Sequence, residues 1–304
     1  GKYRLSGMIL LLSGRLKSIL PEIISPTQSA FITSRMITGN ILIAYECVHK
    51  IKNKRSGQSG LCAVKLDMLK AYDRVEWGFL NQVMLKLGFQ PFWVEMIMEC
   101  VSSVRYKVRF NGCETDEIVP TRGLRQGDPL SPYLFLLCAE GFSSLLNKAE
   151  VNGNLKGISI CNAAPSFNHL LFADDSLVLI KATSESARYL QSILHLYEVC
   201  SGQIVNYDKS FVMFSKNTRR ERKQSVLAEL HINTEARSER YLGLPVYVGQ
   251  DRAKTFQYLK ERIWKRIQGW IERLLSKMGK DVLIKACAQA IPTFAMSCFD
   301  LTKS

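Results

Sequence analysis

The sequence lacks the residue patterns of zinc sites and of disulfide-stapled scaffolds. Its nine cysteines include no CxxC pair, and its four histidines have no metal-ligand spacing. This distribution favours free, mostly buried thiols in an intracellular protein. The one candidate targeting segment, Met8–Leu12, has only five apolar residues, too few for a membrane span or a signal sequence. The sequence begins at Gly1 without an initiating Met, so we expect a piece of a longer protein.

Internal repeats and low-complexity tracts are also missing, as is a regular alternation of strand and helix signals. The chain is nevertheless long and apolar enough for a large core, with 304 residues of which 47% are hydrophobic. We therefore expect one elaborate domain or two subdomains. The irregular order of helix and strand signals predicts an α+β fold in place of a doubly wound parallel sheet.

The chain does have an excess of basic residues, and they gather toward its end. The formal net charge is +14, and residues 209–304 contain 19 Lys and Arg against 9 Asp and Glu. That segment carries a net charge of +10, which leaves +4 for residues 1–208. A basic surface of this kind indicates a polyanionic partner, although a membrane surface attracts the same charge.

Three aspartates stand next to apolar segments that read as strands. The stretch 169–179, HLLFADDSLVL, predicts a hairpin with Asp174 and Asp175 at its tip, and LCAVKL at 61–66 predicts a buried strand that ends at Asp67. If the three carboxylates converge, they form a hard oxygen site suited to Mg²⁺. The alternatives are that the Asp pair serves only turn chemistry and that Asp67 is a solvated strand end.

Asp73, in contrast, has a structural explanation. The segment Asp73-Arg-Val-Glu76 has the form of a capping box, and it predicts a helix that continues through Trp77 to a C-cap at Gly88. We therefore assign chemistry to Asp67 and helix capping to Asp73.

A glycine-containing loop precedes a second helix. In the segment 121–142, Gly123 and Gly127 permit close backbone approach, Arg125 and Gln126 supply donors, and Ser131 followed by proline predicts a helix N-terminus. Such a loop is a weak phosphate-binding signal when taken alone, and a plain connection is the alternative.

The C-terminal segment predicts a basic amphipathic helix. Its apolar positions recur at helical spacing: Ala253, Phe256, Leu259, Ile263, Ile267, Trp270 and Leu274. Basic residues lie among them: Arg252, Lys260, Arg262, Lys265, Arg266 and Arg273. We expect the apolar stripe to pack on the core and the charges to bind a phosphate backbone, with a membrane-surface helix as the alternative.

Five motifs in this order resemble those of one protein family. KLDMLKAYDRVEW, GLRQGDPLSPYLFLL, HLLFADDSLVL, GQIVNYDKSFVMFS and YLGLPVYVG are similar to the palm motifs of non-LTR (LINE-type) retrotransposon reverse transcriptases, especially those of plants. The resemblance extends from about Leu16 to Thr302. It implies a right-hand polymerase fold, with fingers and an antiparallel palm sheet in residues 1–248 and a partial helical thumb in residues 249–304.

The resemblance implies an RNA-directed DNA polymerase, a nucleotidyltransferase that adds dNTPs to a primer 3′-hydroxyl with two Mg²⁺ ions, or with Mn²⁺. Asp67, Asp174 and Asp175 resemble the metal ligands of the family. Tyr72 resembles the aromatic residue that rejects a ribose 2′-hydroxyl, and the pair 126–127, Gln126 and Gly127, resembles the loop over the nucleotide. The implied partners are an RNA template, a DNA primer and dNTPs, with no membrane.

The remaining motifs imply three further roles. Lys209 resembles the lysine near the leaving pyrophosphate, and Arg35 resembles an arginine of the fingers that contacts the triphosphate, with a surface arginine as the alternative. Leu242 and Gly243 resemble the primer-grip turn. The resemblance also implies action in the nucleus, although the sequence does not separate nucleus from cytoplasm.

Several positions depart from the family pattern. Thr33-Ser34 stands where Pro-Gly is frequent, Gly39 where Asp is usual and Leu69 where a small polar residue is common. These departures, with the poor match of the first 13 residues, suggest a degenerate copy, so a catalytically inactive nucleic-acid-binding remnant is one alternative. A nucleotidyl cyclase is another, and the basic C-terminal segment argues against it.

Overall fold

The computed structural model describes the chain except for residues 1, 162, 237–239, 250, 272–275 and 302–304. At its centre is a four-stranded sheet, in which every pairing is antiparallel. Its strands, in spatial order, are β6 (His169–Phe172), β7 (Asp175–Lys181), β1 (Leu61–Leu66) and β8 (Phe211–Phe214). The antiparallel sheet confirms the predicted α+β class, and both the strand at 61–66 and the hairpin at 169–179 are confirmed.

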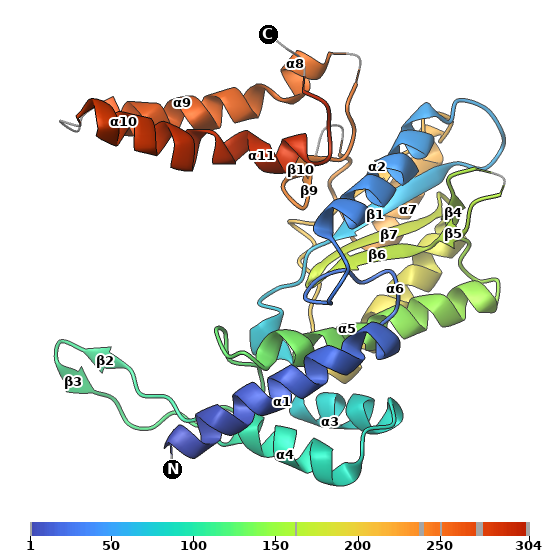
Figure 1. Cartoon of the computed structure of the whole chain (residues 1–304). Helices are drawn as coiled ribbons and strands as arrows, with labels where there is room; N and C mark the ends of the chain where they lie inside the picture. The colour runs from blue at the N-terminus through green and yellow to red at the C-terminus, as the bar shows by residue number, and fades with distance from the viewer. Residues whose placement is uncertain (1, 162, 237–239, 250, 272–275, 302–304) are drawn as a thin grey trace.

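Helices cover both faces of the sheet (Figure 1). One face packs on α2 (Ile37–Asn53), and the other contributes to the largest hydrophobic core together with the remaining helices of the main body. These are α1 (Lys2–Ile23), η1 (Tyr72–Arg74), α3 (Trp77–Lys86), α4 (Pro91–Ser102), α5 (Ser131–Val151), α6 (Ser184–Ser201) and α7 (Arg220–Leu230). Strand β1 is buried along its whole length because it is covered on both faces.

Side chains of β1 alternate between these two faces. Cys62, Val64 and Leu66 point into the large core, whereas Leu61 and Ala63 point toward α2. Since side chains in a strand alternate with period two, Lys65 shares the α2 face. A lysine in this position needs a partner, because an unpaired buried ammonium is costly.

Outside the central sheet, the described part of the chain contains three short hairpins. They are formed by β2 (Arg109–Phe110) with β3 (Cys113–Glu114), β4 (Ile158–Ser159) with β5 (Ser166–Phe167), and β9 (Arg240–Tyr241) with β10 (Leu244–Pro245). The first projects away from the body, and the third lies between the sheet and the C-terminal helices (Figure 1).

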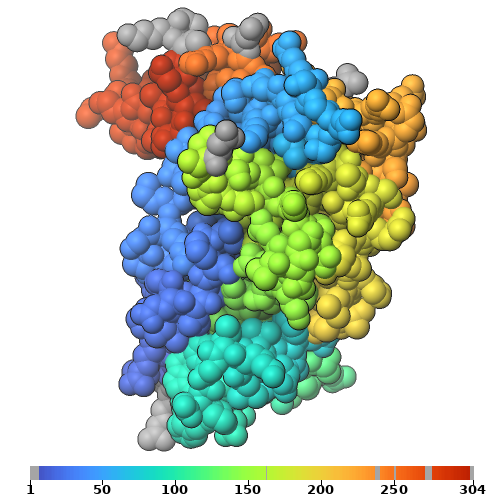
Figure 2. Space-filling model, turned by 90° about the vertical axis from the view of Figure 1, so that its right-hand side faces the viewer, coloured from blue at the N-terminus to red at the C-terminus, as the bar shows by residue number. Residues whose placement is uncertain are grey.

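The C-terminal helices form a separate lobe, seen apart from the sheet in Figure 1. They are α8 (Arg252–Thr255), α9 (Gln257–Ile271), α10 (Lys277–Leu283), the π-helix η2 (Ile284–Ala288) and α11 (Ala290–Met296). The predicted continuous helix is interrupted at Phe256, which is buried with Leu259 in a cluster shared with Ile41 of α2 and Leu244 of β10. Of the predicted stripe and charges, Leu274 and Arg273 lie outside the described residues. Figure 2 shows this lobe lying against the α2 region at one end of an elongated molecule.

Two predicted helix starts are wrong in detail. Helix α3 begins at Trp77 with Glu76 as its N-cap residue, and Asp73 lies in η1, so the Asp73–Glu76 capping box does not form. The separate turn forms because the Asp73 amide donates to the carbonyl of Lys70 and the Leu124 amide donates to that of Tyr72. Helix α5 includes Ser131, and the side chain of Asp128, not of Ser131, accepts a bond in the preceding turn, from the Leu130 amide.

The nine thiols are free, as the sequence predicts, but fewer than half of them are buried, so the expectation of mostly buried thiols is wrong. Every cysteine is free; four are buried (Cys47, Cys62, Cys100 and Cys138), and the exposed ones are Cys113, Cys161 and Cys200. In the described ranges, no helix combines the length and the apolar character needed to cross a membrane.

His169, at the start of β6, is a buried core residue with hydrogen-bond partners at both ring nitrogens. Its Nε2 lies 2.8 Å from both Thr27 Oγ1 and Ser143 Oγ, and its Nδ1 lies 2.5 Å from Asn168 Oδ1. Burial lowers the pKa of His169 to about 4. The imidazole therefore stays neutral in the folded protein at pH values at which the unfolded chain takes up a proton.

This pKa predicts an acid-dependent loss of stability. The stabilisation that neutral His169 provides is complete above the unfolded pKa of about 6.5 and falls as the pH drops toward 4. Urea unfolding at pH 7.5 and 5.5 should show the parent losing about 1 kcal/mol more than His169→Gln. Equal losses in the two proteins would contradict the assignment of this pKa.

Candidate active site

The catalytic-type carboxylates meet at one end of the central sheet. Leu66 pairs with Ser176 and Lys65 with Leu177, so the antiparallel register, continued by one residue, sets Asp67 opposite Asp175. Both aspartates share the α2 face with Lys65, because positions 65 and 67 of one strand and 175 and 177 of the other have the same parity.

Lys65 joins the two aspartates. Its Nζ lies 2.5 Å from Asp175 Oδ1 and 3.4 Å from Asp67 Oδ1, and the residue is only 8% exposed. The two Oδ1 atoms cannot therefore lie farther apart than the sum of these distances. The predicted convergence of Asp67 with the hairpin tip is thus present in the geometry, with an ammonium group between the carboxylates.

Asp174 lies at the exposed turn between β6 and β7, beside this pair. Ala173, the other residue of the turn, has a positive φ of 53°, which is a strained conformation for a residue with a Cβ. The pKa of the Asp174 carboxyl is raised, first by partial burial and further by the negative charges of Asp175 and Asp67. Three carboxylates are therefore close enough to repel one another.

The carboxylate oxygens of Asp67, Asp174 and Asp175 are of the type that a hard divalent cation binds, although the three groups do not converge on a single point. Across the residues that the structure describes, no three His, Cys, Asp or Glu side chains form a ready metal site. The fit comes from the chemistry: oxygen donors, mutual repulsion, and a cationic group already held between Asp67 and Asp175. A metal ion bound by both aspartates would compete with the Lys65 ammonium for them.

Tyr72 lies close to this acidic group. Its ring stacks on Phe135 with centroids 4.7 Å apart and an interplanar angle of 16°. Burial raises the pKa of Tyr72 to about 12, and the charge of Asp174 adds to the effect. The phenol is thus neutral, held rigidly by stacking, and within electrostatic reach of the hairpin tip.

Lys209 is placed by a loop that is fastened to Asp67. The Asn206 amide donates to the Asp67 carbonyl (2.8 Å), and the Asp67 amide donates to Ser210 Oγ (3.1 Å). Lys209 itself is exposed, so its ammonium carries no desolvation penalty. Because its loop is bonded to Asp67, Lys209 lies at the same end of the sheet as that aspartate.

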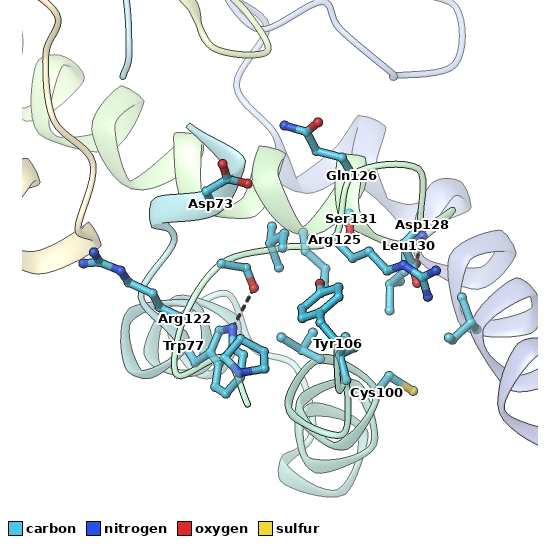
Figure 3. Close-up of a pocket in the computed structure, with 17 residues that line it drawn as sticks. Asp73, Trp77, Cys100, Tyr106, Arg122, Arg125, Gln126, Asp128, Leu130 and Ser131 are labelled. Atoms are coloured by element: carbon cyan, nitrogen blue, oxygen red, sulfur yellow. Dashed lines mark hydrogen bonds between the residues drawn. The ribbon is translucent and has the colours of Figure 1, made fainter. Parts of the chain in front are cut away.

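Gln126 lines a cavity of about 460 Å³, together with Asp73, Trp77 and Arg125 (Figure 3). The Trp77 indole donates to the Gly123 carbonyl (2.8 Å) and fixes the wall of this cavity. In the close-up, the side chains of Gln126 and Asp73 extend away from the Trp77 and Cys100 end of the cavity. The predicted loop therefore forms one wall of the cavity, and three consecutive residues of it, Arg125, Gln126 and Gly127, are exposed.

The two glycines of this loop serve different purposes. Gly123 has a φ of 91°, and a Cβ added to it would lie 2.7 Å from the Asp73 carbonyl oxygen. Gly127 has a φ of 84°, but nothing lies within 4 Å of its Cβ position. The close approach at Gly123 is therefore internal, and only Gly127 leaves open space for a ligand.

Arg35 has partners within its own segment. Its guanidinium donates to four backbone carbonyls, those of Pro21, Ile24, Ser25 and Gln28, at 2.7 to 3.1 Å. Burial lowers the pKa of Arg35, and the charge of Glu140 opposes that shift. Arg35 therefore fastens the end of α1 to the following loop, and a triphosphate contact would require some of these bonds to break.

Leu242 and Gly243 form the two-residue turn between β9 and β10, with φ values of 51° and 80°. Positive φ at both positions is the geometry of a type I′ turn. The preceding residue, Tyr241, is 2% exposed, and its raised pKa reflects burial and the charge of Asp175. The residue before this turn is therefore within electrostatic reach of the Asp175 end of the sheet.

Four important residues are missing from the sequence-based predictions. Lys65 could have been found, because a lysine inside the apolar strand LCAVKL, two residues before Asp67, requires a partner on the same face. The others are Gln28, Asn40 and Tyr241, whose contacts cross more than 100 residues of sequence. A single sequence carries no comparable signal for them.

Comparisons with known proteins agree with this geometry. The family model described as Reverse transcriptase (RNA-dependent DNA polymerase) matches residues 3–246. A 149 kDa protein of transposon TX1 from Xenopus laevis is 27% identical over 96% of this chain and 22% of its own length. The Pol polyprotein of retrotransposable element R2DM from Drosophila melanogaster is 30% identical over 49% of this chain and 13% of its own length.

A solved structure extends the likeness to the fold. Telomerase from Candida tropicalis, solved with a fragment of telomeric RNA, superimposes with a TM-score of 0.53 at 14% identity, over 94% of this chain and 46% of that one. This similarity confirms the predicted right-hand polymerase fold. The chain spans less than a quarter of the length of the two curated relatives.

The loop geometry predicts a large difference between two glycine substitutions. Gly123→Ala should lower the free energy of unfolding by well over the ~1 kcal/mol that a positive φ alone costs, because its Cβ meets the Asp73 backbone. Gly127→Ala is the matched control, since it has a similar φ and open space, and should cost about 1 kcal/mol. Equal costs in urea titrations would contradict the contact between this loop and η1.

Proposed function

The chain belongs to the reverse transcriptase family, and from this premise we propose that it is the polymerase part of a LINE-type retrotransposon protein, an RNA-directed DNA polymerase. The five motifs and their order support the non-LTR type, as does similarity to proteins of a transposon and of a retrotransposable element. The proposed reaction is attack of a primer 3′-hydroxyl on the α-phosphate of a dNTP, with an RNA template and release of pyrophosphate.

One observation carries this proposal. Asp67 and Asp175, on adjacent strands, reach the same Lys65 ammonium, and Asp174 stands beside them with a raised pKa. An acidic group at the end of an antiparallel sheet is what a nucleotidyl transfer site requires, because negative charge there can hold divalent cations against a triphosphate.

We assign metal binding to the carboxylates of Asp67, Asp174 and Asp175, and Mg²⁺ is the proposed cation, with Mn²⁺ as a substitute. When bound, such cations supply activation of the attacking hydroxyl and stabilisation of charge on the leaving group. The contribution of the chain is to hold the carboxylates at fixed strand positions. The Lys65 ammonium offsets part of their mutual repulsion while the site is being filled.

Tyr72 is proposed to select the sugar. Its ring is immobilised by stacking on Phe135 and lies in the electrostatic range of Asp174, which supports a position beside the incoming nucleotide. A rigid ring there would exclude a 2′-hydroxyl by steric contact. The exposed residues Gln126 and Gly127 are proposed to lie over the nucleotide and the template base, where Gly127 leaves room for close approach.

Lys209 and Arg35 are proposed to act on the phosphates. The loop that carries Lys209 is hydrogen-bonded to Asp67, so its exposed ammonium can neutralise charge on, or donate a proton to, the departing pyrophosphate. Contact of Arg35 with the triphosphate requires its guanidinium to exchange some of its four backbone carbonyl partners for phosphate oxygens.

Three parts of the chain are assigned to binding of the template and the primer. We propose that residues 1–248 form fingers and palm, that Leu242 and Gly243 position the primer 3′ end, and that residues 249–304 form a partial thumb. The exposed basic residues of α9 support phosphate-backbone binding: Lys260, Arg262, Lys265 and Arg266. The proposed substrates are an RNA template, a DNA primer and dNTPs, and the proposed place of action is the nucleus.

Asp174 is expected to be essential for nucleotide incorporation. Primer extension on an RNA template should be abolished in Asp174→Ala, because removal of one carboxylate leaves too little negative charge to hold the cations. Asp116→Asn, which removes an exposed carboxylate from the projecting hairpin, is the control and should retain parent activity. If the parent binds primer–template but incorporates nothing, the chain is a binding remnant and the proposed function is wrong.

Tyr72 is expected to determine which sugar of the incoming nucleotide the site accepts. Tyr72→Ala should admit ribonucleotides, raising the ratio of rNTP to dNTP incorporation about 100-fold or more, since a steric barrier is removed. Tyr72→Phe keeps the stacked ring and should preserve the discrimination of the parent. Unchanged discrimination in Tyr72→Ala, measured in the same extension assay, would count against this role.

A further inference from the structure

Four buried polar side chains connect the catalytic turn to the β9–β10 hairpin. Gln28, Ser29, Asn40 and Tyr241 are 1%, 9%, 4% and 2% exposed. They come from the segment before α2, from α2 itself and from β9. Buried polar groups are costly unless they are bonded, so their arrangement is informative.

The first end of this connection is at Gln28. Its Oε1 accepts from the Ala173 amide (3.1 Å) and from the Ala30 amide (2.9 Å). Ala173 is the strained residue immediately before Asp174 and Asp175. A strained backbone persists only when its surroundings hold it, and Gln28 supplies a side-chain bond to that amide.

The segment around Gln28 also extends the sheet. The Leu171 amide donates to the Thr27 carbonyl (2.9 Å), and the Ser29 amide donates to the Leu171 carbonyl (3.2 Å). Residues 27–29 therefore run along the free edge of β6 in a parallel bridge. The catalytic hairpin is thereby fixed from the edge as well as from β1.

The other end of the connection is at Asn40. Its Nδ2 donates to the Leu171 carbonyl (2.9 Å) and to Ser29 Oγ (2.7 Å), and its Oδ1 accepts from the Tyr241 hydroxyl (3.0 Å). One amide thus bonds β6, the edge segment and β9. Tyr241 immediately precedes the turn formed by Leu242 and Gly243.

We propose that Gln28, Asn40 and Tyr241 are positioning residues that form a buried connector, which fixes the catalytic turn at 173–175 relative to the turn at 242–243. None of the three contacts the reacting atoms. The part of the inference that concerns primer placement rests on the proposed function, because it takes the second turn as the primer grip. Misplacement of a reactant by about 1 Å is enough to slow a reaction strongly.

The test compares two substitutions that each delete one buried hydroxyl. Tyr241→Phe removes the bond to Asn40, and Tyr197→Phe is the matched control, because Tyr197 is 4% exposed and its hydroxyl donates to the Cys138 carbonyl (3.3 Å) in the other core. Both variants keep the ring and its packing. The readouts are hydrogen exchange of amides 169–175 and the separate kcat and KM values of primer extension.

In Tyr241→Phe we expect the exchange rate of amides 169–175 to rise about tenfold, because the lost bond no longer restrains the two turns. For the same reason we expect the kcat of primer extension to fall about tenfold, whereas the KM for dNTP should stay unchanged. Tyr197→Phe should leave both readouts at the parent values. Equal exchange in the two variants would overturn the connector. If the parent incorporates no nucleotide, the proposed function fails, whereas the exchange comparison still decides the connector.

Discussion

The register of β1 against β7 is the constraint on which the site depends. It sets Asp67 opposite Asp175, and a shift by one residue would turn one of the two aspartates to the opposite face. The register is fixed by the apolar residues of β1, which are buried on both faces of the sheet. The energy that holds the carboxylates together against their repulsion therefore comes from hydrophobic packing, and Lys65 reduces the repulsion that remains.

Local patterns were sufficient to predict the strands and the turn that carry Asp67, Asp174 and Asp175. An apolar run interrupted by Lys65 predicted the strand 61–66, and two apolar runs around an Asp pair predicted the hairpin, because a strand buried on both faces needs mostly apolar residues. The predicted capping box does not form, because Asp73 lies in a 3₁₀ turn at 72–74 whose Tyr72 carbonyl accepts from the Leu124 amide, 52 positions away. A local sequence motif contains no information about hydrogen bonds made by residues that are distant in the chain.

The residues around the acids were less predictable, for the same physical reason. Lys65 belongs to the acidic group only because two strands pair, and the Asn40–Tyr241 bond joins residues 201 positions apart. The roles proposed for Tyr72, Lys209, Leu242 and Gly243 rest on family resemblance. In the fold, Tyr72 feels the charge of Asp174, Ser210 next to Lys209 is bonded to Asp67, and Tyr241 next to the 242–243 turn feels the charge of Asp175. Arg35 shows the opposite case, in which the predicted ligand contact competes with four internal bonds.

The central claim, that the 67 and 174–175 carboxylates together hold divalent cations, is tested most directly by Mn²⁺ titration of the labelled protein in NMR spectra. Substoichiometric Mn²⁺ should broaden the amide signals of Asp67, Asp174 and Asp175 first. Those of Leu61 and Lys181, a pair at the opposite end of the same strands and about 20 Å away, should persist. Uniform broadening along both strands, or broadening that spares Asp67, would contradict a shared metal site.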